Sequence, residues 1–144
     1  MGIKDIFSLR LREIISLIIS LPITLYVNFC CLPFKTALKL PIFVGHKTRI
    51  GKLSRIITFG CKPTTFMVRI GWGGTESRDE GRKNYLFLNE NASLKFNGRC
   101  TISSGASLVL DLGSLEIGDN FFCNKNCAVS CNYRITIGDN ALFG

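Results

Sequence analysis

Apolar residues spaced six positions apart dominate the second half of the chain. Ile117, Cys123, Val129 and Ile135 follow this spacing, and many of the residues around them are Gly, Asn, Asp or Ser. Six residues suffice for one short strand and one tight turn, so side chains in phase with the period point inward at every level of a stack. Three such faces make a coil of about eighteen residues. The pattern predicts an all-β fold, a parallel β-helix.

A longer repeat supports the same fold. The segment Leu115–Asn120 (LEIGDN) returns as Ile135–Asn140 (ITIGDN), twenty residues later. A repeat at this distance indicates stacked coils, with about two residues beyond the ideal coil. Gly and Asn tolerate the positive φ that a sharp corner needs, so the GDN boxes are expected at corners.

The period continues upstream with one irregularity. Phe96, Ile102 and Leu108 are six apart, but the step from Leu108 to Ile117 is nine. We interpret residues 111–113 (Asp-Leu-Gly) as a small outward bulge at one corner. The alternative is a β-sandwich with Gly-rich turns, although sandwich strands recur every 8 to 12 residues and alternate with period two.

The first forty residues have a different character. An uncharged run of 21 residues, Ile14–Phe34, lies between basic residues. Pro22 divides it, and only Ile14–Leu21 is strongly apolar, which predicts a short helix. Four polar residues dilute the run: Ser16, Ser20, Thr24 and Asn28.

Three roles for this segment stay open. It could cap the open end of the stack, lie on a membrane surface, or span a bilayer. No convincing signal-peptide cleavage site follows the apolar core. The chain thus divides into a helical segment 1–40, first coils 41–75, a projecting polar loop 76–84, and a hexapeptide-repeat region 85–144.

The charge of the chain is uneven. The formal net charge is +8, and residues 1–75 hold eleven Lys or Arg against Asp5 and Glu13, a balance of +9. A basic surface suits anionic lipid headgroups or phosphorylated ligands. No nucleic-acid-binding motif accompanies the charge, so no nucleic-acid partner is expected.

The cysteines favour a reduced, cytoplasmic setting. Their number is seven, which is odd, and no C-x-x-C pair occurs. Cys123, Cys127 and Cys131 lack a nearby histidine and follow the inward rhythm, so we interpret them as small buried side chains and predict no metal. The pair Cys30 and Cys31 could carry a lipid beside a membrane.

Two further motifs carry little weight. Residues 71–74 (Gly-Trp-Gly-Gly) could cradle a phosphate, but the Lys and Ser or Thr of a P-loop are absent. Asn91 begins a glycosylation acceptor motif, which has no meaning in a cytoplasmic chain.

The region 94–144, with its two IGDN boxes, resembles the left-handed parallel β-helix of the hexapeptide-repeat acyltransferases. The N-terminal part is similar to members of that family found with polysaccharide and lipopolysaccharide genes. The similarity lies in Leu21-Pro22, Leu32-Pro33-Phe34-Lys35, Ala37, Lys39-Leu40-Pro41 and Val44-Gly45-His46-Lys47.

The resemblance implies an enzyme that transfers an acyl group, usually acetyl, from coenzyme A to a sugar hydroxyl or amine. It also implies a homotrimer with active sites between subunits. The expected function is therefore O-acetylation of a sugar of a cell-surface polysaccharide, at the inner face of the cytoplasmic membrane. The alternative is a non-catalytic β-solenoid that binds or scaffolds.

The chain departs from the family in its histidines. The family's general base lies on a loop after the coil that would follow Gly144, and such a base needs a pKa near neutrality. The single histidine here, His46, falls in the first coil and is expected to be a surface or cap residue. We therefore assign no catalytic, donor-binding or metal residue, and expect an inactive N-terminal portion of a longer acyltransferase.

Overall fold

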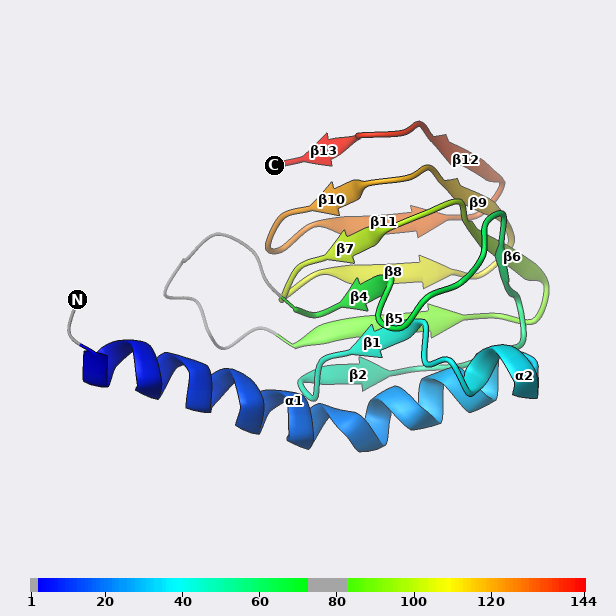
Figure 1. Ribbon diagram of the computed structural model, residues 1–144. Helices are drawn as coiled ribbons and strands as arrows, with labels where there is room; N and C mark the ends of the chain where they lie inside the picture. The colour runs from blue at the N-terminus through cyan, green and yellow to red at the C-terminus, as the bar shows by residue number, and fades with distance from the viewer. Residues whose placement is uncertain (1–2, 73–82) are drawn as a thin grey trace.

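The computed structural model describes residues 3–72 and 83–144, and the fold is mostly β (Figure 1). Parallel strands form three sheets, and each sheet takes every third strand in chain order. Sheet A contains β1 (Ile42–Val44), β4 (Val68–Ile70), β7 (Cys100–Ile102), β10 (Phe121–Cys123) and β13 (Leu142–Phe143). Sheet B contains β2 (Thr48–Ile50), β5 (Asn84–Leu88), β8 (Ser107–Leu110) and β11 (Ala128–Cys131). Sheet C contains β3 (Ile57–Phe59), β6 (Ala92–Phe96), β9 (Gly113–Ile117) and β12 (Arg134–Ile137).

The two IGDN boxes lie one above the other, as the repeat predicted. Ile117 of β9 pairs in register with Ile137 of β12. Asn120 and Asn140 both have positive φ, 57° and 58°, and Asn120 Nδ2 donates to Asn140 Oδ1 at 3.0 Å. Asparagine thus occupies the corner because its side chain both tolerates the left-handed backbone and bonds to its counterpart one layer away.

The inward side chains form one core between the sheets. Alternation along each strand points every second residue inward, as in β6, where buried and exposed residues alternate. Burying large aliphatic and aromatic side chains stabilises the stack by about 1.5–3 kcal/mol each. Among the fully buried are Phe96, Phe121, Leu86, Leu88, Leu94, Ile102, Leu108, Leu110, Leu115 and Ile117.

The predicted bulge after Leu108 is a corner, but the inward register around it differs from the prediction. Leu108 pairs with Val129, and Ile135 pairs with Leu115 and not with Ile117. The strands are long enough to present two inward residues, so a count in steps of six passed over Leu115. Leu112 at this corner is exposed, as the bulge required.

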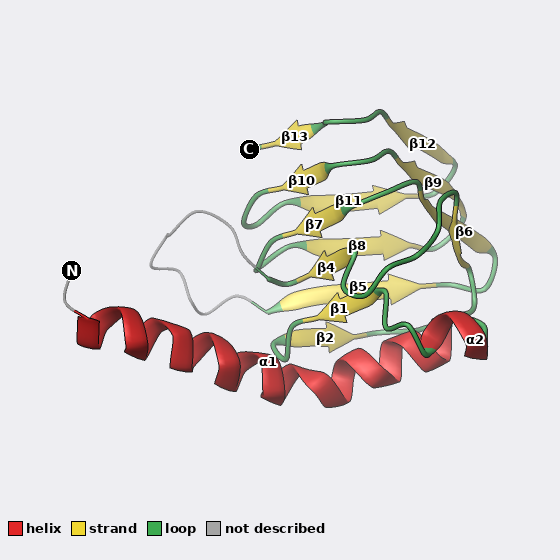
Figure 2. Ribbon diagram, in the orientation of Figure 1, coloured by secondary structure: helices red, strands yellow, loops and turns green. Residues whose placement is uncertain are grey.

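The N-terminal helix is longer than predicted. Helix α1 (Ile3–Cys31) runs through Pro22 without a break, and the short helix α2 (Phe34–Ala37) follows it. A proline inside a helix costs about 3 kcal/mol because it removes one backbone hydrogen bond. Helix α1 lies along the first layer of strands, and its N-terminal part extends beyond them (Figure 2).

A row of polar side chains attaches α1 to the free edge of β1, which offsets that cost. Thr24 Oγ1 donates to the Val44 carbonyl and accepts from the Val44 N–H, both at 3.1 Å. Asn28 Nδ2 donates to the Ile42 carbonyl at 2.6 Å, and the Ile42 N–H donates to Asn28 Oδ1 at 3.2 Å. Ser20 Oγ accepts a hydrogen bond from the backbone N–H of His46, two residues after Val44, at 2.9 Å.

The spacing of this row has a geometric reason. Residues four apart on a helix rise about 6 Å, and residues two apart on a strand rise about 6.6 Å. Asn28 and Thr24 therefore meet alternate residues of β1, and Ser20 meets His46 in the turn that follows it; all three polar side chains are fully buried. Because a bare sheet edge exposes unpaired N–H and C=O groups, α1 acts as the cap that was one of the three predicted roles.

Two further predictions concern the projecting polar loop and the cysteines. Residues 76–82 of the predicted projecting loop lie outside the described residues, while Asn84 is the buried first residue of β5 and donates to Thr48 Oγ1 at 3.1 Å. Cys131 is a buried free thiol as predicted, but Cys123 and Cys127 form a disulfide. Cys123 is buried as predicted but Cys127 is only half-buried, because a spacing of four brings an inward residue beside a corner residue, and the disulfide between them differs from the reduced setting that the sequence favoured.

Candidate functional site

The outer face of sheet A carries a candidate site. The side chains at its outward positions stack in register from Phe43 through Arg69 and Thr101 to Phe122. Their strand neighbours point inward, because alternate residues face opposite sides of a sheet. This face thus changes from aromatic at the helix end to basic and hydroxylated in the middle.

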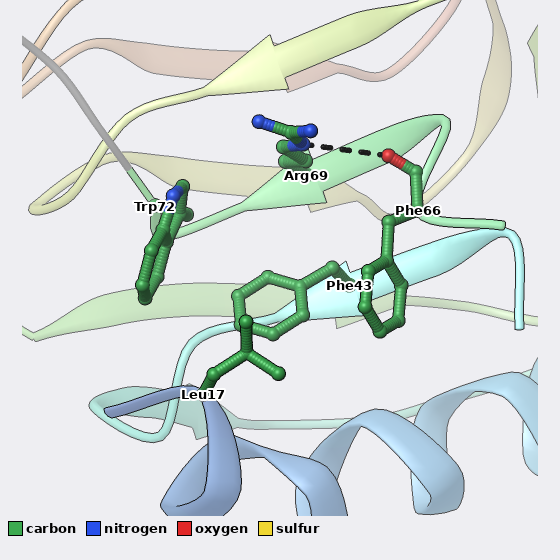
Figure 3. A pocket seen from close by; sticks show the side chains of 5 residues that line it. All are labelled: Leu17, Phe43, Phe66, Arg69 and Trp72. Carbon is green, nitrogen blue, oxygen red and sulfur yellow. Dashed lines mark hydrogen bonds between the residues drawn. The ribbon is translucent and has the colours of Figure 1, made fainter. Parts of the chain in front are cut away.

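An aromatic pocket of about 120 Å³ lies where this face meets α1 (Figure 3). The Phe43 ring contacts Phe66 on one side and Trp72 on the other, with ring centroids 5.2 and 5.3 Å apart and both pairs edge-on. Leu17 of α1 and Arg69 of β4 complete the lining. Edge-on aromatic contacts of this kind stabilise a pair by about 0.5–1.5 kcal/mol beyond burial, so they help to hold the three rings in the pocket wall.

Phe66 adopts an unusual backbone conformation that places it in this wall. Its φ is 54°, in the left-handed region that residues with a Cβ avoid. The Phe66 N–H donates to the Leu40 carbonyl at 2.9 Å, which holds the turn against β1. Such a conformation costs about 1–3 kcal/mol and persists where surrounding contacts enforce it, often at a binding site.

A larger basic groove, of about 360 Å³, continues from the pocket and shares Phe66 and Arg69 with it. Arg99 and Thr101 line it from the layer above, and Asn120 from the next corner. Within residues 3–72 and 83–144, no carboxylate forms an ion pair with Arg69 or Arg99. Arg69 Nε makes only a long bond, 3.5 Å, to the Phe66 carbonyl, so both guanidinium groups are available to a ligand.

The chemistry of this surface favours an anion with an apolar or ring-shaped neighbour. The planar guanidinium group of an arginine can bind two phosphate oxygens at once through its fork of N–H donors. The groove volume is near the lower limit for small-molecule sites, about 300–1,000 Å³, and the aromatic pocket alone is well below it. The two together, joined at Arg69, make a site for part of a larger ligand.

His46 lies away from this site, at the turn after β1. Its side chain is exposed, and its Nδ1 is 3.3 Å from Ser20 Oγ, the hydroxyl that caps the strand edge. No described carboxylate bonds to its ring. The placement agrees with the prediction of a surface or cap residue.

The other candidates from the sequence gather into no site. Within the described part of the chain, no three metal-ligating side chains converge. Cys31 is buried, and burial raises the pKa of its thiol to about 12, which disfavours the thiolate that lipid attachment requires. Gly71 sits at a turn with a φ of 77°, and residues 73–74 of the proposed phosphate cradle lie outside the described residues.

Sequence reasoning missed Arg69 and Arg99. The alternation in Val68-Arg69-Ile70 and Cys100-Thr101-Ile102 did indicate which side chains point outward. Their proximity follows only from the pairing of β4 with β7, across a span of 32 residues from Val68 to Cys100. A period of six does not predict that pairing when a long insertion intervenes.

Comparison with protein-family models, with curated proteins and with solved structures finds no match for this chain. A functional assignment therefore depends on the residues themselves and on the geometry of sheet A.

Proposed function

We propose that the three sheets form a left-handed parallel β-helix and that the chain belongs to a sugar O-acyltransferase. The fold proposal is supported by strands that pass to the three sheets in turn, and by IGDN corners in register twenty residues apart. Hexapeptide spacing has the same origin, since each inward residue needs one strand and one turn.

The basic groove beside the aromatic pocket is the observation that carries the functional proposal. Acetyl coenzyme A, the proposed donor, combines phosphates with an apolar arm and a ring. Arg69 and Arg99 suit the phosphates, and the pocket around Phe43 suits an apolar group. The acceptor in this proposal is a sugar of a cell-surface polysaccharide precursor, and a homotrimer would complete each half-formed groove from a neighbouring subunit.

The proposal also concerns the general base of the transfer reaction, which His46 does not supply. A general base must lie within hydrogen-bond reach of the acceptor hydroxyl, and His46 is outside the groove and occupied by the cap. The 144-residue chain is therefore expected to bind the donor without transferring its acetyl group. It would act at the inner face of the cytoplasmic membrane.

Calorimetric titration with coenzyme A tests the groove. Charge-assisted hydrogen bonds contribute about 1.5–3 kcal/mol, so Arg69→Gln and Arg99→Gln should each weaken binding about tenfold or more. Arg49→Gln is the matched control, because Arg49 is an exposed arginine of β2 in sheet B. No binding by the wild type, or equal effects of all three changes, would reject the groove as the donor site.

The second candidate is a non-catalytic module that presents its sheet faces to a partner. The position of His46 favours it, because the chain offers no other imidazole as a base. Acetyl transfer to a panel of sugars separates the two classes. Transfer by the 144-residue chain would overturn the missing-base proposal and make His46 the first residue to substitute.

A further inference from the structure

Helix α1 has a second face that no described part of the chain covers. Six large apolar side chains on it are between 42 and 59% exposed. They form what we call the apolar helix face: Ile14, Ile15, Ile18, Ile19, Leu25 and Tyr26. Exposed apolar residues scattered singly need no explanation, but a contiguous set marks an interaction surface.

The apolar helix face lies opposite the face that caps β1. At about 100° per residue, its six members span about 140° of the helix circumference. Ser20, Thr24 and Asn28 lie roughly 110–170° from the middle of that sector, on the docked side. The helix thus presents polar groups to the strand edge and a continuous apolar stripe to its surroundings.

The stripe continues past the end of α1, and cations flank it. Phe34 and Leu38 are 67 and 60% exposed, and the lysines that follow each of them, Lys35 and Lys39, are exposed too. Near the other end of the helix, Arg10 is also exposed. Apolar residues with flanking lysine and arginine are typical of helices that lie in a membrane interface.

The cap contacts decide how the helix can meet a bilayer. The segment Glu13–Cys31 is long and apolar enough to cross a membrane by length and composition. However, residues 20–28 are bonded lengthwise to β1, so a crossing would pull a charged sheet into the hydrocarbon. The uncharged part before the cap, Ile14–Ile19, spans only about 9 Å, against about 30 Å of hydrocarbon.

Charge distinguishes the two remaining occupants of the stripe. Residues 1–75 carry a balance of +9, so a second copy seated here would bring like charges together. An anionic lipid surface complements both the stripe and its lysines. Each lysine near such a surface raises the membrane affinity about fivefold.

We propose that α1 lies flat in the interface of an anionic membrane, with the apolar helix face inserted and the sheets held above the lipid on the capped side. This proposal does not depend on acyl transfer. It accounts for both faces of one helix: the polar row holds the strands, and the apolar stripe holds the membrane.

Flotation with vesicles tests the proposal. Vesicles of phosphatidylcholine with phosphatidylglycerol should carry the chain to the top of a gradient, and pure phosphatidylcholine vesicles should carry much less. The double substitution Ile14→Gln with Ile18→Gln should reduce binding about tenfold or more, since two aliphatic side chains leave the lipid. Leu112→Gln, at an exposed leucine on a corner of the sheets, is the matched control and should bind as the wild type does.

Circular dichroism melting establishes that each variant is folded, and Ile14 and Ile18 are exposed enough for the midpoints to agree. Carbonate should extract the wild type from vesicles; resistance to carbonate would mean a spanning helix and overturn the proposal. Absence of flotation, or flotation unchanged by the double substitution, would also overturn it. If the wild type fails to float and the double substitution lowers its oligomeric state, a second copy covers the stripe instead.

Discussion

Replacing Asn28 with leucine should uncouple α1 from the first strand. Asn28 is fully buried and bonds to both backbone groups of Ile42. Leucine has a similar size and a higher helix propensity, so Asn28→Leu removes the two hydrogen bonds while it keeps the volume and favours the helix. The measured effect therefore reports on the strand edge.

The magnitude follows from the groups left behind. The Ile42 N–H and C=O would remain buried without partners, and each such group costs about 1–3 kcal/mol. Water can reach one of them if the helix shifts, so we expect a loss of about 2–5 kcal/mol in the free energy of unfolding. Domains of this size are stable by about 5–15 kcal/mol, so the effect is a large fraction of the total.

Urea unfolding followed by circular dichroism gives the free energy, and amide hydrogen exchange locates the change. The Ile42 amide should lose protection, while the Val44 amide, which donates to Thr24, should keep more of it. The control is the reverse exchange on the exposed side, Leu25→Asn, which should cost less than about 1 kcal/mol. Equal midpoints for Asn28→Leu and the wild type, with Ile42 still protected, would refute the role of the polar row.

Three further predictions concern the sheets. Gly113 has a φ of 84° and its missing Cβ would meet the backbone of the neighbouring layer, so Gly113→Ala should lower the unfolding free energy by at least about 2 kcal/mol in urea titration. Maleimide labelling of the denatured chain, purified without reductant, should count five thiols because Cys123 and Cys127 are joined; seven would support the reduced setting. Asn97 donates to Glu116 at 2.8 Å and, as the largest cause, lowers the pKa of that carboxyl. The resulting stabilisation is present above the ordinary glutamate pKa and is lost as the pH falls through the lowered value. In Asn97→Ala, an NMR titration should give a Glu116 pKa higher than that of the wild type. An unchanged Glu116 pKa would contradict this prediction.

The sequence predicted the stacking well, because stacking is a local property repeated along the chain. Each inward residue has neighbours directly above and below, so the period and the corner residues appear in any two adjacent repeats. Asn120 and Asn140 are the clearest case, since their left-handed backbones were expected from residue type alone. The exact inward register was harder to predict: Leu115 lies within the irregular step of nine from Leu108 to Ile117, where the count of six gave no inward residue.

The basic groove could not be predicted in the same way. Arg69 and Arg99 come together through the pairing of β4 with β7, and the intervening chain is longer than an ordinary repeat. Phe66 enters the pocket through a turn with positive φ, which no aromatic residue signals. Long-range pairing and strained turns are therefore where the periodic argument ends.

The length and the docking of helix α1 were not predicted, because the polar and apolar residues of the segment were considered together and not face by face. Taken together, Ser20, Thr24 and Asn28 weaken an apolar run, and Pro22 interrupts it. At a spacing of four, the same three residues match alternate backbone groups on a strand edge, and Val27 and Cys31 on the docked side of the helix add apolar contacts with the core. The exposed apolar residues on the other side of the helix therefore need a separate explanation. The mean hydropathy alone would place this segment in a bilayer. Its two faces have different roles: the polar row hydrogen-bonds to the edge of the sheet, and the exposed aliphatic side chains face the membrane surface in our proposal. A test that changes one face should therefore leave the property of the other intact: Asn28→Leu should weaken folding, and Ile14→Gln with Ile18→Gln should weaken lipid binding.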